Sequence, residues 1–399
     1  MSGGVEDPVA AALALPLVQF DARPDVIDLG WGHPDPQLLP LEELRTAADE
    51  AARRWGPDLY AYGFAQGPAP LIEWLSNRLG EVDGRAPDPA SIVITAGASG
   101  AFDMVITQST RPGDVALVES PTYHIAVKLL RDHGLEVVPI RRDADGPVLD
   151  ALSGTLDELH RAGRRPSLFY TIPTFHNPTG SVLPLDRRVE LVRLAASRGL
   201  LIVEDDAYRE LSYGEPPPPS LWSLAEPGSV VRVGSFSKTL APGLRLGFLT
   251  GEPALTARLA QGGLLDSGGG IGHIPGLVVA VLAEGGFYAR HVERLRSAYR
   301  ERRDALVRGL SEALPETVEL NRPEGGFFLW LTLPEDHAVS RLLEHSRANG
   351  VSFMPGNAFS LTDNLDASLR LSFSRYSPDQ LAEAARRIGA SYAQAAPTR

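Results

Sequence analysis

The 399-residue sequence contains no cysteine, which excludes disulfide bonds, a thiolate nucleophile and metal ligation by cysteine. Cations are outnumbered as well: 38 lysines and arginines stand against 50 aspartates and glutamates, and the net charge is −12. This balance argues against a nucleic-acid or anionic-membrane surface. No apolar run approaches the roughly 20 residues that a membrane span needs, and the N-terminal sequence lacks the basic region of a signal peptide. We therefore expect a cytoplasmic protein that uses neither nucleic acid, membrane nor metal.

Lysine is the scarcest cation, with only Lys128 and Lys238 beside 36 arginines. A guanidinium stays protonated at any usable pH, whereas a desolvated ammonium can lose its proton and form a Schiff base with a carbonyl. Lys238 stands in a motif that also holds Ser235, Ser237 and Arg245. A reactive amine with surrounding hydroxyl and guanidinium donors suits an aldehyde that carries a phosphate. An ordinary lysine in a serine-rich loop is the alternative.

From residue 91 onward, short apolar runs alternate with helical patterns. The runs cover 91–95, 115–119, 136–140, 167–172, 200–204, 230–234 and 245–250, and helical patterns cover 99–108, 124–133 and 186–197. Strands that are apolar throughout and separated by helices are typical of a parallel sheet with both faces covered. We therefore predict an α/β fold with a mostly parallel central sheet surrounded by helices.

The chain is longer than the roughly 250–300 residues at which a single core stops growing, so we expect two structural domains. A weakly patterned arm covers residues 1–24. The predicted large domain covers 56–284, and the predicted smaller α+β domain combines 25–55 with 285–399. Helical patterns at 41–55, 287–314 and 377–395 belong to this scheme, and the long second one is expected to span both domains.

Polar residues follow the predicted strands at the carboxyl ends, where open α/β sheets bind their ligands. They are Gly97, Tyr123, Asn177, Asp205 and Lys238. Because parallel strands end at one common edge, we expect these residues to share one site. That edge is the first indication of function in the sequence.

Each of these positions has a chemical interpretation and a simpler structural one. The helix start at Gly97 can cradle a phosphate with its backbone N–H groups, or it can be a plain turn. Tyr123 can stack on a flat ring or stand at the rim. The Asn177 amide, before Pro178, can donate to an oxygen. Asp205, in a run of three carboxylates, needs a cationic partner if it is buried; the simpler alternative is that Asp205 or Asp206 caps a helix.

Together these motifs resemble the class I/II aminotransferases of fold type I, especially the branch that includes 2-aminoadipate aminotransferases. The motifs are Ser-Phe-Ser-Lys with Arg-Leu-Gly (235–247), Asn-Pro-Thr-Gly (177–180) and Glu-Asp-Asp-Ala-Tyr (204–208). The resemblance runs from about Val26 to the C-terminus. It implies pyridoxal 5′-phosphate as cofactor and ping-pong transfer of an amino group from an L-amino acid to a 2-oxo acid.

The resemblance also implies residue roles. Lys238 would form the Schiff base and move the proton of the substrate, Asp205 would hold the ring nitrogen protonated, and Tyr123 would stack on the ring. Asn177 and Tyr208 would bond the ring's phenolic oxygen. The phosphate would lie among Gly97, Ala98, Ser99, Ser235, Ser237 and Arg245.

Two further sites follow from the same resemblance. Arg370, in Leu-Arg-Leu-Ser-Phe, would grip the α-carboxylate of the substrate with its fork of donors. Gly32, Asn177 and Trp31 would lie beside the substrate. Tyr62, with Tyr60 as a nearby alternative, would reach the phosphate of a partner subunit, which implies a homodimer with shared active sites.

Departures from the family pattern concern the substrate. Trp31 and His33 add bulk and a titratable group near the expected side-chain pocket, and the run Gly268–Gly272 makes a glycine-rich loop that we expect at the interface. The same fold also supports pyridoxal-phosphate lyases, decarboxylases and oxidases. A ligand-sensing domain of a transcription regulator is a more distant alternative, since we expect little room before Val26 for the DNA-binding module it needs.

Overall fold

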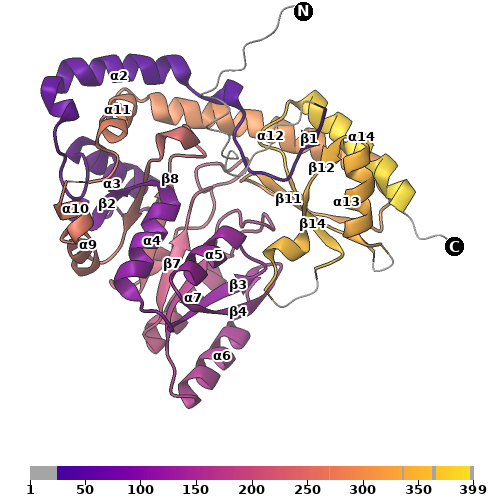
Figure 1. Cartoon of the computed structure of the whole chain (residues 1–399), viewed down its shortest axis with the longest axis horizontal. Coiled ribbons are helices and arrows are strands. Elements are labelled where there is room, and N and C mark those ends of the chain that lie inside the picture. The colour runs from indigo at the N-terminus through magenta and orange to yellow at the C-terminus, as the bar shows by residue number, and fades with distance from the viewer. Residues whose placement is uncertain (1–24, 269, 335–336, 362–364, 396–399) are drawn as a thin grey trace, which may run out of the picture.

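The computed structural model describes residues 25–268, 270–334, 337–361 and 365–395. The predicted N-terminal arm, residues 1–24, lies outside this range. The described chain forms a large body around an eight-stranded sheet and a smaller body around a four-stranded sheet (Figure 1). Within it, no helix has both the length and the apolar character needed to cross a bilayer.

The eight-stranded sheet carries the residues that the sequence places after strand ends. Its spatial order is β2 (Ile92–Thr95), β9 (Gly247–Thr250), β8 (Val230–Ser235), β7 (Leu201–Asp205), β6 (Pro166–Thr171), β3 (Val115–Ser120), β4 (Glu136–Asp143) and β5 (Gly146–Pro147). The neighbours from β8 to β4 are parallel. The predicted mostly parallel sheet is therefore confirmed. Two strands differ: β9 runs antiparallel to both β2 and β8, and the short β5 runs antiparallel to β4.

Helices cover both faces of this sheet because successive strand side chains point to opposite sides. On β3, Ala116 and Val118 pack in one core and Val115 and Leu117 in the other. The first core includes α4 (Gly97–Ser109), α5 (His124–Asp132), α9 (Pro253–Ala260) and α10 (Gly263–Asp266). The second includes α6 (Leu149–Arg161), α7 (Leu185–Arg198) and α8 (Leu221–Leu224).

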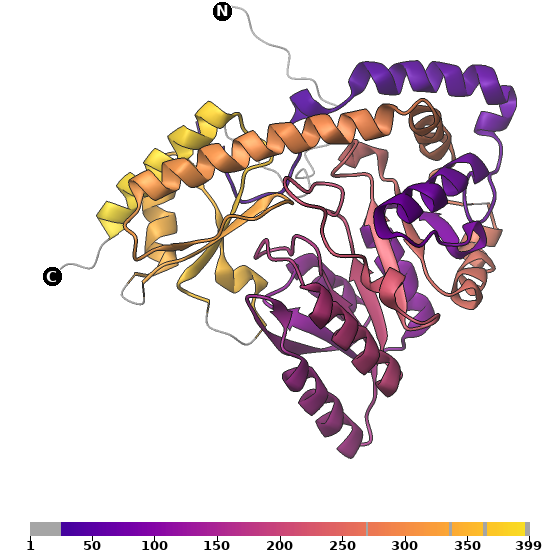
Figure 2. The same cartoon turned by 180° about the vertical axis from the view of Figure 1, so that it is seen from behind.

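The smaller body is an antiparallel sheet covered by helices. Its strand order is β10 (Glu319–Leu320), β11 (Phe328–Thr332), β14 (Ser368–Ser372) and β13 (Met354–Pro355). The helices are α12 (Phe287–Ala313), α13 (Val339–Ala348) and α14 (Pro378–Ala395), and β1 (Ile27–Asp28) pairs in parallel with β12 (Val351–Ser352) nearby. From behind, α12 is seen to run along one side of both bodies (Figure 2).

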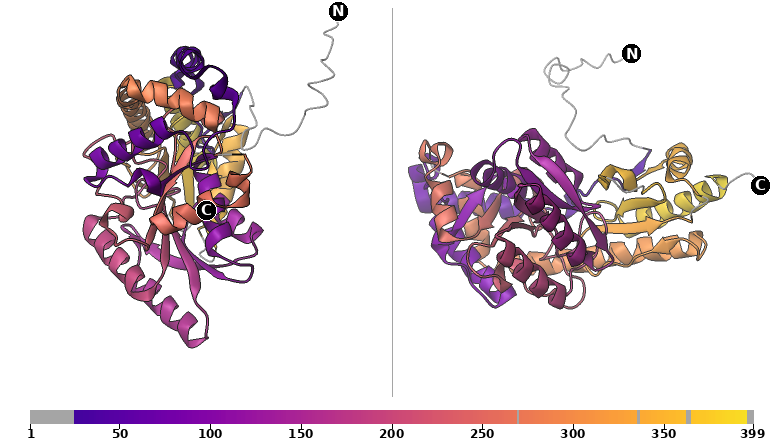
Figure 3. Two further views of the ribbon diagram at one scale, coloured as in Figure 1. Left: turned by 90° about the vertical axis from the view of Figure 1, so that its left-hand side faces the viewer. Right: turned by 90° about the horizontal axis from the view of Figure 1, so that it is seen from below.

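Helix α12 belongs to both cores, as its long pattern predicts. Near its start, Tyr288 and Val292 pack in a core with α3 (Ala69–Asp83) and β2. Further along, Leu295 and Leu310 pack in the core of the four-stranded sheet. Seen from below, the smaller body, which contains the C-terminal part of the described chain, lies beside the large body (Figure 3).

The segment 25–55, which we assigned to the smaller domain, is divided between the two bodies. Strand β1 pairs with β12, whereas Ala47 and Ala51 of α2 (Leu41–Trp55) pack against Leu277 and Leu282 of α11 (His273–Glu284). Helix α11 begins directly after the glycine-rich run, with Gly272 as its N-cap residue. Its long apolar sequence has weak helical periodicity, because it is buried on most sides.

Candidate active site

A cavity of about 560 Å³ lies where the carboxyl ends of β7 and β8 meet β11 and β14. Its volume is in the range typical of small-molecule sites. Among the residues predicted for the site, Trp31, Gly32, Ala98, Ser99, Tyr123, Asn177, Asp205, Tyr208, Ser235, Ser237, Lys238, Arg245 and Arg370 line it. Gly97 and Tyr62 do not line it, although Gly97 precedes Ala98 and lies beside the Arg245 guanidinium.

Lys238 presents an amine to this cavity just beyond the end of β8. Its Nζ donates a hydrogen bond to the carbonyl oxygen of Gly32 at 3.0 Å. Burial first, and then the positive Arg370 guanidinium, lower the pKa of Lys238 to about 8, against the opposing effect of Asp205. A substantial fraction of this lysine is therefore a neutral amine, and hence a nucleophile, at mildly alkaline pH.

Asp205 presents a carboxylate at the end of β7. Its Oδ2 accepts a hydrogen bond from the Tyr170 hydroxyl at 2.6 Å, and its Oδ1 accepts from the backbone N–H of Ala207 at 3.3 Å. Burial raises the pKa of Asp205 to about 6, although both hydrogen bonds act to lower it. Among the described residues, no cation forms an ion pair with this carboxylate within 4 Å. A cationic ligand group would satisfy it.

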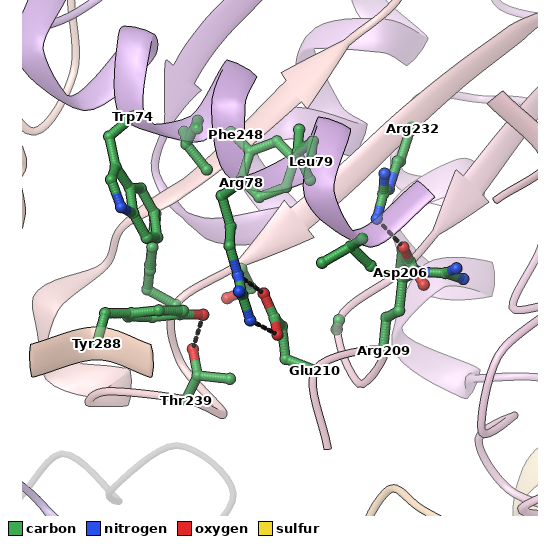
Figure 4. A pocket seen from close by; sticks show the side chains of 15 residues that line it. Trp74, Arg78, Leu79, Asp206, Arg209, Glu210, Arg232, Thr239, Phe248 and Tyr288 are labelled. Atoms are coloured by element: carbon green, nitrogen blue, oxygen red, sulfur yellow. Dashed lines mark hydrogen bonds and ion pairs between the residues drawn. The ribbon is translucent and has the colours of Figure 1, made fainter. Parts of the chain in front are cut away.

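The two carboxylates beside Asp205 have structural partners. Glu204 accepts hydrogen bonds from the backbone N–H groups of Leu221 and Trp222, at the start of α8. Asp206 pairs with Arg232 at 2.6 Å, on the wall of a second cavity of only about 40 Å³. Figure 4 shows this pair beside the Arg78–Glu210 pair. The alternative that Asp205 or Asp206 caps a helix is wrong, because no helix of the described chain begins after β7 before α8, and Asp205 is the carboxylate that faces the main cavity.

An anion cradle forms the end of the cavity at the start of α4. The first turn of this helix carries Ala98 and Ser99, whose backbone N–H groups have no partner within the helix. Gly97 has φ of +75°, and a Cβ there would lie 3.1 Å from a guanidinium nitrogen of Arg245. Arg245 itself has φ of +46°. Such strain in a residue other than glycine concentrates at functional sites. The hydroxyls of Ser235 and Ser237 complete this end.

Arg370, on β14, closes the opposite side of the cavity. It is 2% exposed, and its guanidinium lies between the rings of Phe328 and Phe359, 4.0 and 4.5 Å from their centroids. Its Nη1 donates to Oδ1 of Asn177 at 2.6 Å, and its Nη2 donates to the carbonyl of Gly30. Burial lowers the pKa of Arg370 to about 10. In the described part of the chain no carboxylate pairs with it, and its Nε is buried without a partner.

This donor set fits pyridoxal 5′-phosphate. Between an anion cradle and a buried carboxylate lies a single amine, and Tyr123 and Tyr208 line the space between them. The cradle suits a phosphate, the Asp205 carboxylate suits a pyridinium nitrogen, and the amine suits an aldehyde. The unpaired Arg370 guanidinium suits a carboxylate from a second molecule.

Comparison with known proteins gives the same answer. The family model described as aminotransferase class I and II matches residues 24–388. The chain belongs to this family. It is 35% identical to the 2-aminoadipate transaminase of Thermus thermophilus over 96% of its own length and 94% of that protein's. It is 33% identical to aromatic-amino-acid aminotransferase 1 of Thermococcus litoralis, over 93% and 89% of the two chains.

A solved structure is also similar. The Pyrococcus horikoshii kynurenine aminotransferase, crystallised with PMP, superimposes with a TM-score of 0.87 at 30% identity over 97% of this chain and 98% of its own. The predicted family, fold and enzyme class are thereby confirmed: the protein is an aminotransferase of fold type I. Its cofactor is pyridoxal 5′-phosphate.

A buried network that sequence reasoning missed holds the Asn177 loop of the aminotransferase. Arg142, from β4, donates to Glu119 at 3.1 Å, to Thr179 at 3.0 Å and to Ser181 at 2.6 Å. Glu119 also accepts from the Thr171 hydroxyl and from the backbone N–H of Ile172. The signal in the sequence was a glutamate at the end of an otherwise apolar strand, which needs a buried partner. The partner itself is 23 residues away and gives no local signal.

His124 is a second residue that the sequence did not single out. It is the first residue of α5, next to Tyr123, and its ring lines the main cavity. Its Nδ1 is buried without a hydrogen-bond partner. Burial first, and then Arg370, lower the pKa of His124 to about 4, so the imidazole is neutral at ordinary pH.

Tyr62 lies on the outer surface of the aminotransferase, with 87% of its side chain exposed. Tyr60 and Phe64 in the same loop are also largely exposed. The glycine-rich loop packs beneath them: the backbone N–H of Gly270 donates to the Phe64 carbonyl at 2.6 Å, and Gly268 lies beside the Tyr62 ring. A Cβ at Gly270 would lie 2.6 Å from that carbonyl oxygen, which explains the glycine there. Of this loop, Gly269 lies outside the described residues.

Proposed function

We propose that Lys238 is the residue that binds the cofactor and transfers the substrate's proton in this aminotransferase. The observation that carries the proposal is its position: its amine enters the cavity between the Asp205 carboxylate and the Arg370 guanidinium. The other lysine, Lys128, forms an exposed ion pair with Asp132 on the surface of α5. Lys238 is therefore the only lysine side chain among the described residues that can reach the cofactor.

Asp205 and its partners fix the ring. When bound, pyridoxal 5′-phosphate supplies an aldehyde that accepts amino groups and a protonated ring that withdraws electrons from the substrate's Cα. In our proposal Asp205 keeps the ring nitrogen protonated, and the Tyr170 hydroxyl orients this carboxylate. Tyr208 and Asn177 bond the phenolic oxygen, and Tyr123 stacks on the ring face.

The phosphate is held at the cradle end. Backbone N–H groups at the start of α4, the hydroxyls of Ser99, Ser235 and Ser237, and the Arg245 guanidinium provide its donors. The backbone N–H of Ser237 donates a hydrogen bond to the Ser235 hydroxyl at 3.1 Å, which holds these two residues together. A cradle with fixed donors would orient the cofactor's reactive carbon toward Lys238.

Arg370 binds the α-carboxylate of each substrate in turn. A buried guanidinium without an anionic partner is costly, and a substrate carboxylate supplies that partner. Asn177 orients the Arg370 fork through the bond at 2.6 Å. With the amino donor in place of Lys238 on the cofactor, the Lys238 amine would take the proton from the substrate's Cα and would return it to the cofactor's aldehyde carbon. Because the amino donor and the 2-oxo acid acceptor bind the same Arg370 guanidinium, they must bind one after the other, and we expect ping-pong kinetics.

The functional unit in this proposal is a homodimer. Tyr60, Tyr62, Phe64, Leu264 and Ile274 are exposed large apolar side chains gathered near the glycine-rich loop. Such a cluster is typical of a protein interface. In a symmetric dimer this surface faces its own copy, and Tyr62 can reach the phosphate of the partner's site.

The test of Lys238 is its replacement by alanine. Lys238→Ala is expected to lose both the absorbance of the covalently attached cofactor and about 10²- to 10⁴-fold in turnover, the range typical when general acid–base catalysis is removed. A variant that transaminates at near-native rate would refute the role. Transamination itself is tested with wild-type holoenzyme and one amino acid without an acceptor: we expect one equivalent of 2-oxo acid per subunit, whereas a lyase or decarboxylase would continue to turn over.

A further inference from the structure

The part of the cavity wall that contacts the substrate's side chain is identified by setting aside the lining residues that bind the cofactor or the substrate's α-carboxylate. This step rests on the function proposed above. The cradle, Asp205, Asn177 and the two tyrosines are used by the cofactor, and Arg370 by the carboxylate. The lining residues that are left comprise the wall formed by Trp31, His33, Pro34 and His124, together with Gly32, Ile172, Ala207, Pro242 and Phe328. This wall is where the side chain of the amino acid must lie.

Within the described residues of one subunit, this wall holds no arginine, lysine, aspartate or glutamate that could pair with a charged side chain. The only guanidinium groups that line the cavity within the described residues are Arg245 and Arg370, and both already have an anion to bind. The only carboxylate there is Asp205, on the cofactor's side. Burying a distal carboxylate or ammonium without a partner costs several kcal/mol. The wall therefore favours a neutral side chain.

The wall is also aromatic and held in place. The rings of Trp31 and His124 lie 6.5 Å apart with an interplanar angle of 50°, and His124 meets the edge of Phe359 at 5.4 Å. The backbone N–H of Thr122 donates to the Phe359 carbonyl at 3.1 Å, which ties the start of α5 to the smaller body. Flat aromatic surfaces with this spacing pack well against another ring.

His124 adds one polar atom to that wall. Because Nδ1 is buried without a partner, a hydrogen bond from this ring to a ligand must use Nε2. The imidazole contacts aromatic rings on three sides, those of Trp31, Tyr123 and Phe359. A polar atom at the side of an aromatic pocket is worth most to a ligand that carries a matching polar group on its ring.

We propose that the amino donor is an L-amino acid with an uncharged aromatic side chain that bears a hydroxyl or similar hydrogen-bonding substituent. Its ring lies against Trp31 and His124, and Nε2 of His124 bonds the substituent. His124 and Trp31 are thus specificity-determining residues, and neither carries out the chemical step.

The experiment is a single-turnover comparison of donors with the holoenzyme, followed by cofactor absorbance and 2-oxo acid yield. L-Tyrosine, L-phenylalanine, L-leucine, L-glutamate and L-2-aminoadipate are the probes. We expect tyrosine to give the highest kcat/KM, about 3- to 10-fold above phenylalanine, which is the usual range for one net hydrogen bond. Glutamate and 2-aminoadipate should be slower than phenylalanine by about 100-fold or more.

The variants separate the ring from its polar atom. His124→Phe keeps an aromatic wall and should bring the tyrosine-to-phenylalanine ratio to about one. Trp31→Ala should lower kcat/KM for both aromatic donors by about 10-fold or more through lost ring contact, and leave leucine much less affected. His133→Phe, after the other end of α5 and outside the cavity, is the matched control, and its ratio should equal that of the wild type.

The outcomes separate a failure of the proposed transamination from a failure of the assignment of an aromatic amino donor. If no amino acid converts the cofactor, the proposed function itself is overturned. If glutamate, 2-aminoadipate or leucine is the best donor, transamination stands and the aromatic assignment is overturned. If the ratio is unchanged in His124→Phe, or changes equally in His133→Phe, the role of His124 is overturned.

Discussion

Two clusters of buried charge lie back to back in this molecule, and they differ in how their charges are matched. Behind Asp205, Asp83 pairs with Arg209 at 2.7 Å and with Arg232 at 2.5 Å, and Arg232 also pairs with Asp206. In the main cavity, Arg370 and Asp205 lack an ion-pair partner among the described residues. Matched charges hold β7 and β8 in place, whereas unmatched ones mark where ligands complete the set.

Removing one member of the matched cluster should have the largest effect. Arg232→Met leaves Asp83 and Asp206 buried with less compensation, and we expect the free energy of unfolding to fall by about 3–5 kcal/mol. Chemical denaturation of the purified enzyme measures this. A loss below about 1 kcal/mol would show that these ion pairs do not stabilise the fold, which would contradict the structural role assigned to the matched cluster.

The unmatched cluster should respond in the opposite way. Arg370→Lys keeps a positive charge but loses the planar fork, so we expect kcat/KM for the best donor to fall about 100-fold. The unfolding free energy of the same variant should fall by less than that of Arg232→Met, because Arg370 loses hydrogen bonds and ring contacts but no ion pair. Steady-state kinetics and chemical denaturation of one preparation measure the two expected effects, on kcat/KM and on the free energy of unfolding. An activity loss that merely followed a stability loss would contradict the distinction.

The unmatched charges also tune Lys238, which gives a pH-dependent prediction. Only the neutral amine attacks the cofactor's aldehyde, and its pKa is lowered to about 8. The rate of cofactor attachment to apoenzyme should therefore rise about tenfold per pH unit below 8 and level off above it. Arg370→Met removes a positive neighbour and should move this inflection to higher pH. Stopped-flow absorbance between pH 6 and 10 measures it; an inflection that stayed in place would refute the coupling.

The smallest effect should come from the other lysine. Lys128 pairs with Asp132 four residues away, and both side chains are more than half exposed. Lys128→Ala should cost no more than about 0.5 kcal/mol of stability. Cofactor absorbance and turnover should equal those of the wild type, which makes this variant the control for Lys238→Ala. A loss of cofactor here would show that lysine scarcity had pointed to the wrong residue.

The sequence predicted the elements of the sheet well, because period and apolar length are local properties. The predicted helix over 41–55 coincides with α2, and the run over 115–119 differs from β3 by one residue. Strand direction is not local, and so β9 was not recognised as antiparallel. The packing of α2 against α11 was missed for the same reason, since it depends on contacts more than 200 residues apart.

The site was predictable where a motif joins several functional residues, and not where one residue acts through distant contacts. Thirteen of the predicted residues line the cavity because they follow strand ends or belong to the motifs. His124 was passed over beside Tyr123, since a histidine at a helix start has many simpler explanations. Arg142 was invisible among 36 arginines, because only the folded chain shows that it reaches the loop of Asn177.

Helix α12 has a consequence for the chemistry. It is one uninterrupted helix of 27 residues whose two ends are anchored in different cores. The amine stands on one of those bodies and the carboxylate grip on the other, and a helix of constant rise per residue lies across both. The helix therefore fixes the distance between the Lys238 amine and the Arg370 guanidinium, and so the space into which an amino acid must fit. Changes in the loops that line the cavity can alter which side chain fits there without altering this distance.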